Sequence, residues 1–295
     1  MISILIPAFN DDCTELAAGL ARQAEAIGGL QWELLVGDDA STDAGVVARL
    51  ESIGRRAHCR YIRQEQNAGR AAIRNRRARE ARGEWLRYVD ADLVVVDDNH
   101  LRKLVEAGRH AAACYGGYRV LPGPAGNLRH RYERAAAPVH TAARRRRTPY
   151  LDFKVSNSLI RRDVMLRHPL DERFRKYGYE DVLLGKQLQT AGVCVAHIDA
   201  PVGFERYEDN ARFVRKTEEG IETLHRFRAD LDGFSPLLQM AETLRRMRLA
   251  GPFLFVYRLL GQRWRRNLVS DAPSLQLFKC YKLGYLLSLM AAAED

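Results

Sequence analysis

The chain has 295 residues, of which 46% are hydrophobic, so it can bury a substantial core and wholesale disorder is excluded. Its formal net charge of +10 favours anionic partners such as nucleotides, nucleic acid or an acidic membrane surface, although an arginine-rich composition explains the excess equally well. The five cysteines, at positions 13, 59, 114, 194 and 280, form no C-x-x-C pair. The sequence therefore suggests neither a zinc ribbon nor a redox motif, and it fits a reducing cytosol.

The amino terminus, MISILIPAFN, lacks the charged start and the longer apolar run of a secretion signal. No segment reaches the roughly 18 apolar residues that are needed to cross a bilayer. We therefore expect a cytoplasmic protein without a membrane span.

The first 95 residues alternate between short apolar strands and helices. We predict strands at residues 2–6, 33–37, 59–63 and 84–89, and helices that begin at Asp12 and at residues 44–54 and 70–82. Asp12 and Glu15 are spaced as in a capping box at the start of the first helix. This alternation predicts an α/β fold with a mostly parallel sheet and helices on both faces.

The pattern loosens after residue 113. We predict a strand at residues 114–120 and a mobile, Arg-rich excursion at 121–150. Ordered structure then returns at residues 151–160, in a helix after Tyr179, in a strand near 193–198 and in helices from about residue 210. The expected domains are a catalytic domain of residues 1–230 and a C-terminal helical region of residues 231–295.

Polar residues follow three of the predicted strands. The segments are Pro7-Ala8-Phe9-Asn10, Asp38-Asp39-Ala40-Ser41 and Asp90-Ala91-Asp92. Ligands of parallel sheets bind outside the carboxyl ends of the strands, so these segments mark the expected site. Asp90 and Asp92 suit a hard divalent cation bound to a diphosphate, but a D-x-D string alone is equally typical of a solvated strand end.

Donors for an anionic ligand precede and open the third helix. Asn67 comes before it, and Arg70 and Arg74 lie in its first turns, where the helix N-terminus favours a diphosphate. The alternative is an exposed Arg-rich face. The carboxylate of Asp39 can accept a hydrogen bond from the ring N–H of uracil. An acid cluster at a strand end is costly through like-charge repulsion unless a ligand uses it.

A second acidic pair, Glu180-Asp181, opens a helix directly after Tyr177-Gly178-Tyr179. A carboxylate there is positioned to accept a proton from an attacking hydroxyl. Ordinary N-terminal helix acids that interact favourably with the helix dipole are the alternative.

Five motifs together resemble family 2 glycosyltransferases, which have the Rossmann-like GT-A fold. The motifs are IPAFN, VGDDASTD, NAGRAAIRN, YVDADL and FRKYGYEDVLLGKQL, and the resemblance covers about residues 1–230. It implies an inverting transfer of a sugar from a nucleoside-diphosphate sugar, expected to be a UDP-sugar, to a glycan or lipid-linked acceptor. It also implies a Mn²⁺ or Mg²⁺ cofactor.

The resemblance also implies roles for individual residues. By the resemblance the nucleotide would contact Pro7, Ala8, Phe9, Asp39, Arg70 and Asp90, with Asp90 at the ribose, and Asp92 would hold the metal. The residues themselves add the donors Asn67 and Arg74 to the nucleotide side and Asp90 to the metal. Asp181 would be the general base and Glu180 would hold the acceptor. Asn157 and Tyr179 are further candidates for the acceptor side.

The C-terminal segment departs from the family pattern. Some bacterial members carry a histidine near the metal after the last strand, but Phe204 stands at the matching position here. His197 falls earlier, and we expect it to be a buried strand histidine. The apolar and basic helices of residues 236–292 fit either peripheral contact with the inner face of the cell membrane or a helical cap or dimer contact.

Two other classes compete with this interpretation. A nucleotidyltransferase shares a Rossmann-like core, but it would carry a glycine-rich basic loop after the first strand, where this chain has Phe9-Asn10-Asp11-Asp12. A non-enzymatic nucleic-acid-binding or scaffold protein would use the Arg-rich surface. That class does not explain acids gathered at several strand ends, so we expect no nucleic-acid partner.

Overall fold

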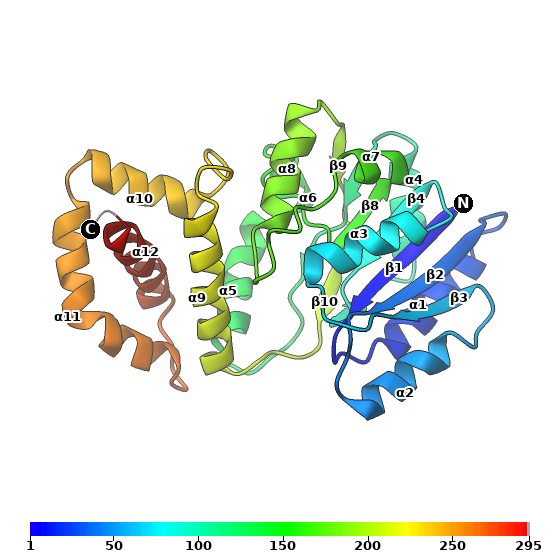
Figure 1. The fold of residues 1–295 in the computed structure, drawn as a ribbon, viewed down its shortest axis with the longest axis horizontal. Coiled ribbons are helices and arrows are strands. Elements are labelled where there is room, and N and C mark those ends of the chain that lie inside the picture. The colour runs from blue at the N-terminus through cyan, green and yellow to red at the C-terminus, as the bar shows by residue number, and fades with distance from the viewer. Residues whose placement is uncertain (294–295) are drawn as a thin grey trace. The chain divides into compact units, whose positions relative to one another are not determined.

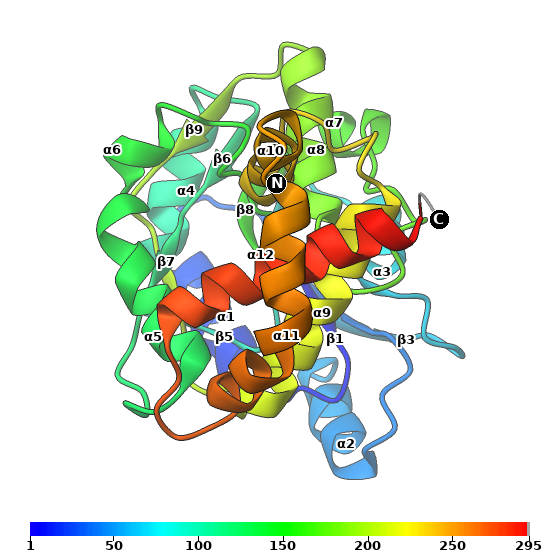
Figure 2. The same ribbon diagram turned by 90° about the vertical axis from the view of Figure 1, so that its left-hand side faces the viewer.

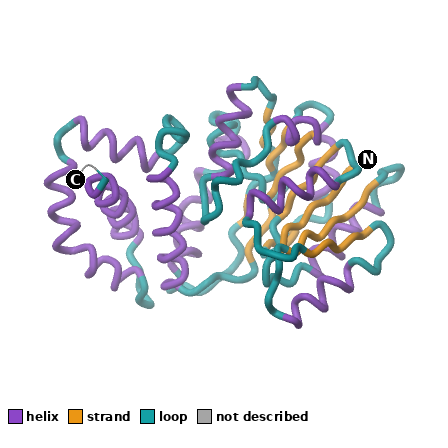
Figure 3. Tube along the Cα trace, in the orientation of Figure 1, coloured by secondary structure: helices purple, strands orange, loops and turns teal. Residues whose placement is uncertain are grey.

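The computed structural model describes residues 1–293 and has an α/β core with helices on both faces of a central sheet (Figures 1 and 3). The strands are β1 (Ile2–Ala8), β2 (Trp32–Asp38), β3 (Cys59–Arg63), β4 (Trp85–Val89), β5 (Leu93–Val95), β6 (Ala113–Tyr115), β7 (Tyr118–Arg119), β8 (Asn157–Arg161), β9 (Val195–His197) and β10 (Val202–Phe204). The helices are α1 (Thr14–Glu25), α2 (Ala44–Ile53), α3 (Arg70–Glu80), α4 (His100–Gly108), α5 (Leu128–Ala136), the 3₁₀ turn η1 (Ala137–Val139), α6 (Ala142–Arg145), α7 (Arg162–Arg167), α8 (Glu180–Thr190), α9 (Asn210–Arg226), α10 (Pro236–Arg246), α11 (Ala250–Leu268) and α12 (Leu275–Ala292).

The central sheet has seven strands in the order β3-β2-β1-β4-β8-β6-β9. All of its neighbours pair in parallel except at β8, which runs antiparallel to both β4 and β6. The prediction of a mostly parallel sheet flanked by helices is confirmed. The carboxyl ends of β1, β2 and β4 therefore meet at one edge, which we call the carboxyl edge.

Apolar side chains alternate between the two faces of the sheet because successive residues of a strand point in opposite directions. Ile4 and Ile6 of β1 lie in one core cluster with residues of α1, α2 and α4. Leu5 lies in the other cluster with residues of α3, α7 and α8. Burial on both faces explains why these strands read as continuous apolar runs.

A small second sheet, β5-β10-β7, continues from the carboxyl edge. β5 begins directly after Asp92 and pairs antiparallel with β10, with Phe204 opposite Leu93. The predicted single strand at 114–120 is wrong, since β6 and β7 belong to different sheets. This small sheet brings the end of β10 beside the D-x-D segment.

The chain divides into two compact units. The first comprises residues 1–121, 139–175 and 180–205, and the second comprises residues 122–138, 176–179 and 206–295. In the second unit, α12 packs against α9, α10 and α11, as Figure 1 shows for the yellow-to-red helices. Residues 206–230 thus group with the C-terminal helices by contact, although the sequence assigned them to the catalytic domain. The functional division at residue 230 stays a prediction.

Two local expectations need correction. Asp12 is not part of a capping box, because α1 begins at Thr14 with Cys13 at the N-cap, and Asp12 instead accepts a hydrogen bond from the Thr14 backbone N–H at 3.0 Å. The segment 121–150, expected as a mobile excursion, contains α5, η1 and α6. Within residues 1–293, no helix combines the length and the apolarity that a membrane span requires.

Candidate functional site

The loops after β1 and β2 are joined at the carboxyl edge by Asn10. Its Oδ1 accepts hydrogen bonds from the backbone N–H groups of Thr42 (2.8 Å) and Asp43 (3.0 Å), and its own N–H donates to Ser41. Asn10 has φ 56°, a left-handed conformation that asparagine tolerates better than most residues. The glycine-free loop after β1 is therefore fixed to the loop after β2.

The two acids that end β2 have different surroundings. Asp38 is fully buried and accepts hydrogen bonds from the Tyr61 hydroxyl at 2.6 Å and from the Ser41 N–H at 2.8 Å. Asp39 accepts from the backbone N–H groups of Ala68 and Gly69, both at 2.9 Å. Asp38 thus stabilises the sheet edge, while Asp39 orients the loop that leads into α3.

Asn67 and Gly69 complete that loop. The Asn67 amide donates to the Asp39 carbonyl oxygen at 3.1 Å. Gly69 has φ 89°, where a side chain would strain the backbone, and it immediately precedes Arg70 at the first position of α3. The predicted nucleotide residues Asp39, Asn67 and Arg70 are therefore connected by direct contacts.

Four charged side chains from three elements then form one ion cluster, the carboxyl-edge cluster: Arg70 and Arg74 of α3, Asp90 after β4, and Glu180 of α8. Arg74 is 2% exposed and lies 2.6 Å from Asp90 and 3.3 Å from Glu180. Arg70 adds a 3.0 Å contact to the other oxygen of Asp90. Burial alone would raise the pKa of Asp90, but the two guanidinium groups outweigh it and lower the pKa below its ordinary value.

Asp181 lies beside this cluster as the second residue of α8. Burial, followed by the neighbouring negative charge of Glu180, raises the pKa of Asp181 to about 6. Its Oδ1 is buried and has no hydrogen-bond partner within residues 1–293. A carboxylate with a raised pKa and an open acceptor oxygen has the properties of a general base.

Asp92 is the exposed acid of the D-x-D segment, whereas both oxygens of Asp90 contact arginines. No group of three or more His, Cys, Asp or Glu side chains suited to a metal occurs in the part of the chain that the structure describes. Mg²⁺ and Mn²⁺ are often held by one or two carboxylates with substrate phosphates and waters, so this donor set fits a cation brought in with a diphosphate.

The remaining nucleotide candidates lie at the end of β1. Ala8 is buried, Pro7 is half-buried and Phe9 is 44% exposed. Because Phe9 follows the strand that pairs with both β2 and β4, its ring is available at the carboxyl edge.

The two acceptor candidates occupy different environments. Asn157 is fully buried; its amide donates to the carbonyl oxygens of Gly117 (2.7 Å) and Ala200 (3.0 Å) and accepts from Arg87 (2.8 Å). Contact with an acceptor would break these bonds. Tyr179 belongs to the second unit, where it is half-buried with φ 70° and burial raises its pKa to about 12. Both acceptor roles stay predictions.

His197 is a buried strand histidine, as expected. Its Nε2 lies 2.8 Å from the Pro149 carbonyl oxygen, and its Nδ1 accepts from Arg145 at 3.2 Å. Arg145 also donates to the carbonyl of Ile198 at 2.8 Å and lies over the Tyr115 ring. Arg145, which lies in the Arg-rich segment expected to be mobile, therefore secures the end of β9.

Sequence reasoning missed three residues near the site. Lys154 has a favourable electrostatic interaction with Asp181, and Tyr118 hydrogen-bonds Ser156 and stacks on Phe204 at 5.3 Å. Glu205 is exposed and directly follows Phe204, the last residue of β10, which pairs with Leu93 next to Asp92. Antiparallel pairing between 93–95 and 202–204 would have revealed Glu205, but strands of three residues leave little periodicity to read.

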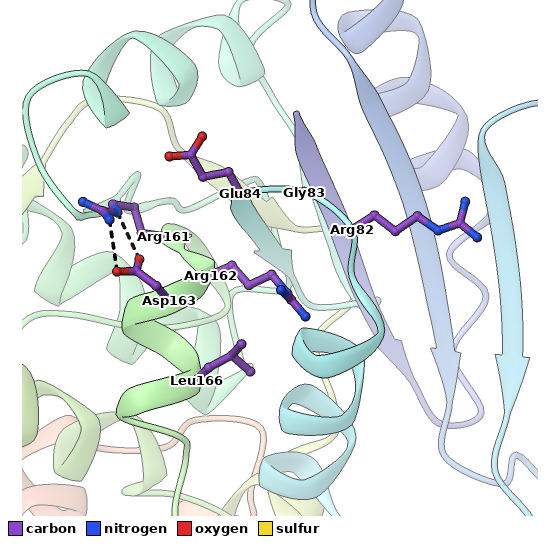
Figure 4. Close-up of a pocket in the computed structure, with 7 residues that line it drawn as sticks. All are labelled: Arg82, Gly83, Glu84, Arg161, Arg162, Asp163 and Leu166. Atoms are coloured by element: carbon purple, nitrogen blue, oxygen red, sulfur yellow. Dashed lines mark hydrogen bonds and ion pairs between the residues drawn. The ribbon is translucent and has the colours of Figure 1, made fainter.

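A shallow hollow of about 370 Å³ lies away from these residues, at the start of β4 and the end of β8 (Figure 4). Its lining includes Arg161 and Asp163, which are joined by two hydrogen bonds of 3.0 Å. Because Trp85 opens β4 here, this is the edge of the sheet opposite the carboxyl edge. The hollow is therefore not part of the candidate site.

The fold resembles those of several solved glycosyltransferases. The mannosyltransferase PcManGT from Pyrobaculum calidifontis, in complex with GDP-Man and Mn²⁺, has a TM-score of 0.61 and 16% identity over 99% of this chain and 86% of its own. S. aureus TarS 1-349 with UDP-GlcNAc has a TM-score of 0.52 and 16% identity over 100% and 92%. Glucosyl-3-phosphoglycerate synthase from Mycobacterium tuberculosis, with Mn²⁺ and UDP, has a TM-score of 0.53 and 18% identity over 77% and 79%. The predicted GT-A fold is confirmed.

Sequence comparison gives the same class. TuaG of Bacillus subtilis (strain 168), provisionally described as a teichuronic acid biosynthesis glycosyltransferase, is 28% identical over 127 residues. That match covers 41% of this chain and 48% of TuaG. The model of the family "Glycosyl transferase family 2" matches residues 3–168, more than half of the chain. The matched segment contains Asp39, Asp90 and Asp92 of the carboxyl edge. Because the family model matches more than half of the chain, the chain belongs to glycosyl transferase family 2.

Proposed function

We propose that the protein transfers a sugar from a nucleoside-diphosphate sugar, preferentially a UDP-sugar, to a hydroxyl of a glycan or lipid-linked acceptor. The transfer inverts the anomeric centre and requires a divalent cation. The observation that carries this proposal is the state of Asp181 beside the carboxyl-edge cluster. Its pKa is raised to about 6, and its Oδ1 accepts no hydrogen bond from the residues that the structure describes.

Asp181 acts as the base of a single displacement. The acceptor hydroxyl loses its proton to Asp181 while its oxygen forms a bond to the anomeric carbon. The bond between that carbon and the diphosphate oxygen breaks, and the nucleoside diphosphate leaves with the electron pair. At pH 7 a carboxyl group with a pKa of about 6 is about tenfold more often ionised than protonated, so the base is ready to act.

The nucleotide lies across the ends of β1, β2 and β4. Asp39 accepts from the uracil ring N–H with a remaining lone pair, while Ala68 and Gly69 keep its carboxylate oriented. Asp90 binds the ribose. Arg70, whose side chain is 43% exposed, reaches the diphosphate, and buried Arg74 holds Asp90 and Glu180 in place.

Asp92 holds the divalent cation, which would neutralise charge on the leaving diphosphate when bound. Donor-bound structures of similar folds support a nucleotide-sugar donor, since PcManGT was solved with GDP-Man and TarS with UDP-GlcNAc, and the Mn²⁺ of the PcManGT complex supports a divalent cation. The name of TuaG, which refers to teichuronic acid biosynthesis, supports a glycan as the acceptor class.

Two measurements test the proposal. A thermal-shift panel of UDP-, GDP-, ADP- and CMP-sugars with and without Mn²⁺ should give its largest stabilisation with a UDP-sugar and metal together. Release of UDP should then fall by about 10²–10⁴-fold in Asp181→Asn. Asp163→Asn, an acid in the first turn of α7, is the matched control. Near-normal turnover by Asp181→Asn on a true acceptor would refute the base assignment.

A further inference from the structure

The second unit exposes an unusual concentration of apolar side chains. Of the twelve large hydrophobic residues that are exposed in the described chain, seven lie between residues 240 and 260. We call them, with the exposed arginines around them, the basic-apolar face: Met240, Met247, Leu249, Phe255, Val256, Leu259, Leu260, Arg245, Arg246, Arg248, Arg258, Arg263 and Arg266. Singly exposed hydrophobics are ordinary, but Phe255, Val256, Leu259 and Leu260 share the exposed side of one helix, α11, and such a set marks an interaction surface.

The core-facing side of α11 is already filled, so this face is not an incompletely packed core. Leu254, Gly261 and Leu268 are buried. A Cβ atom at Gly284 of α12 would lie 2.1 Å from the Tyr257 ring, which means that α11 and α12 are packed as closely as glycine allows. Figure 2 shows α11 crossing α12, with which it is in contact.

Phe255 and Leu259 lie on the opposite side of α11 from these contacts. They are 64% and 66% exposed and are spaced four residues apart, so they project from one stripe of the helix. Arg266 lies on the same stripe, because it follows Phe255 by three helical turns. Arg258 and Arg263 lie on either side of the stripe, and all three arginines are exposed. The stripe is therefore apolar in its first half and basic in its second half.

The charge of the face identifies its partner. Residues 243–270 contain seven arginines and no aspartate or glutamate. Arg265 pairs with Glu218 at 2.8 Å within the same unit, and the other six are exposed. Two copies of this chain would bring like charges together at such an interface, and nucleic acid would leave Phe255 and Leu259 without a role. An anionic lipid surface satisfies both the arginines and the apolar side chains.

We propose that the basic-apolar face binds the surface of a membrane that contains anionic lipids, with α11 lying in the interface and Phe255 and Leu259 inserted between the headgroups. The arginines contact lipid phosphates, and long arginine side chains reach the headgroup level from a helix that lies in the plane. Binding by this face does not depend on the transfer reaction, so it can fail while the proposed function stands.

Vesicle sedimentation tests the proposal. We expect the full chain to sediment with vesicles of phosphatidylglycerol and phosphatidylcholine, to bind pure phosphatidylcholine at least about tenfold more weakly, and to dissociate as salt rises. The double variant Phe255→Ser and Leu259→Ser should lose about tenfold or more in partitioning. Leu166→Ser, an exposed apolar residue of α7 at 41%, is the matched control and should bind normally.

A charge series separates the two contributions. Arg258→Gln, Arg263→Gln and Arg266→Gln together should weaken binding and flatten its salt dependence. The same change at exposed Arg55, Arg79 and Arg109, with an equal loss of net charge, should have a smaller effect. In Phe255→Trp, anionic vesicles should shift the tryptophan emission to shorter wavelength.

Three results would overturn the proposal. One is that the double variant Phe255→Ser and Leu259→Ser sediments with anionic vesicles as well as the control Leu166→Ser. Another is a dimer in solution that the Phe255 and Leu259 changes dissociate, which would assign the face to a second copy. The third is tighter, salt-sensitive binding to an oligonucleotide than to anionic vesicles.

Discussion

Arg74 offers a direct test of the carboxyl-edge cluster because one buried cation holds two carboxylates from distant parts of the chain. Its Nη2 lies 2.6 Å from Asp90, and its Nη1 lies 3.3 Å from Glu180. The substitution Arg74→Met fills a similar volume without the charge. It leaves two buried acids, Asp90 and Glu180, beside Asp181 with a single remaining partner, Arg70.

Removal of one partner from a buried ion pair costs about 3–5 kcal/mol. Arg70 keeps its 3.0 Å bond to Asp90, which favours the lower end of this range, about 3 kcal/mol. At about 2.1 cal/mol/K of unfolding entropy per residue, a loss of 1 kcal/mol lowers the melting temperature of a 295-residue chain by about 1.6 °C, so we expect a decrease of about 5 °C by differential scanning calorimetry.

The loss should depend on pH in a defined direction. Arg74 and Arg70 hold the folded pKa of Asp90 below its ordinary value of 3.8, so this contribution to stability is present above pH 3.8 and is lost as the pH falls through the folded pKa. The difference in the free energy of unfolding between wild type and Arg74→Met should therefore shrink below about pH 4.

Arg76→Met is the matched control, since Arg76 lies on the same helix but is exposed and donates to Gln64. It should cost less than about 0.5 kcal/mol. The reasoning would be refuted if Arg74→Met lost less than about 1 kcal/mol at pH 7, or if both variants lost the same amount.

Three further outcomes follow from the site. The pH profile of kcat/KM should have an acid limb near 6 that belongs to Asp181, whose pKa burial and the charge of Glu180 raise to about 6. Glu180→Gln removes that charge, so the limb should move to lower pH, and an unmoved limb would exclude Asp181 as its source. Asp92→Asn should weaken Mn²⁺ binding in the presence of UDP by tenfold or more in isothermal calorimetry; unchanged affinity would assign the metal elsewhere. Asn10→Ala removes two hydrogen bonds to the loop after β2 and should lower the free energy of unfolding by about 1–2 kcal/mol, measured by urea denaturation. An unchanged free energy would mean that these hydrogen bonds do not stabilise the fold.

Much of the central sheet was readable from local patterns. The four strands predicted in the first 95 residues each appear within two residues of their predicted bounds, and β1 and β2 are the clearest because a parallel strand buried on both faces is a continuous apolar run; the three-residue β5 was not predicted. Asp39, Asp90 and Asp181 could be singled out because acids at the ends of strands and helices interrupt such runs. The parallel order of β1, β2 and β4 predicts that Asp39 and Asp90 lie at one edge, whereas the position of Asp181 beside them depends on how α8 packs.

Other features depend on contacts between residues far apart in the chain. The burial of Asn157 could not be inferred from its neighbours, because its amide bonds reach Gly117 and Ala200 across the fold. Arg145 belongs to a basic run that looks solvated in the sequence, yet it is buried against His197 and Tyr115. The sequence of four consecutive arginines does not show which of them is buried against carbonyl oxygens and which is exposed to water.

The sequence by itself therefore determined where the candidate site residues lie along the chain. It shows which acids follow apolar strands and which glycines and arginines begin the next helix. Tertiary structure alone decided how those charges pair. Arg74 reaches both Asp90 and Glu180, 106 residues from the latter, and Asp181 is left with an open oxygen and a raised pKa. The physical reason is that a pKa and an ion pair depend on burial and on the nearest charges in space, neither of which is encoded in local spacing.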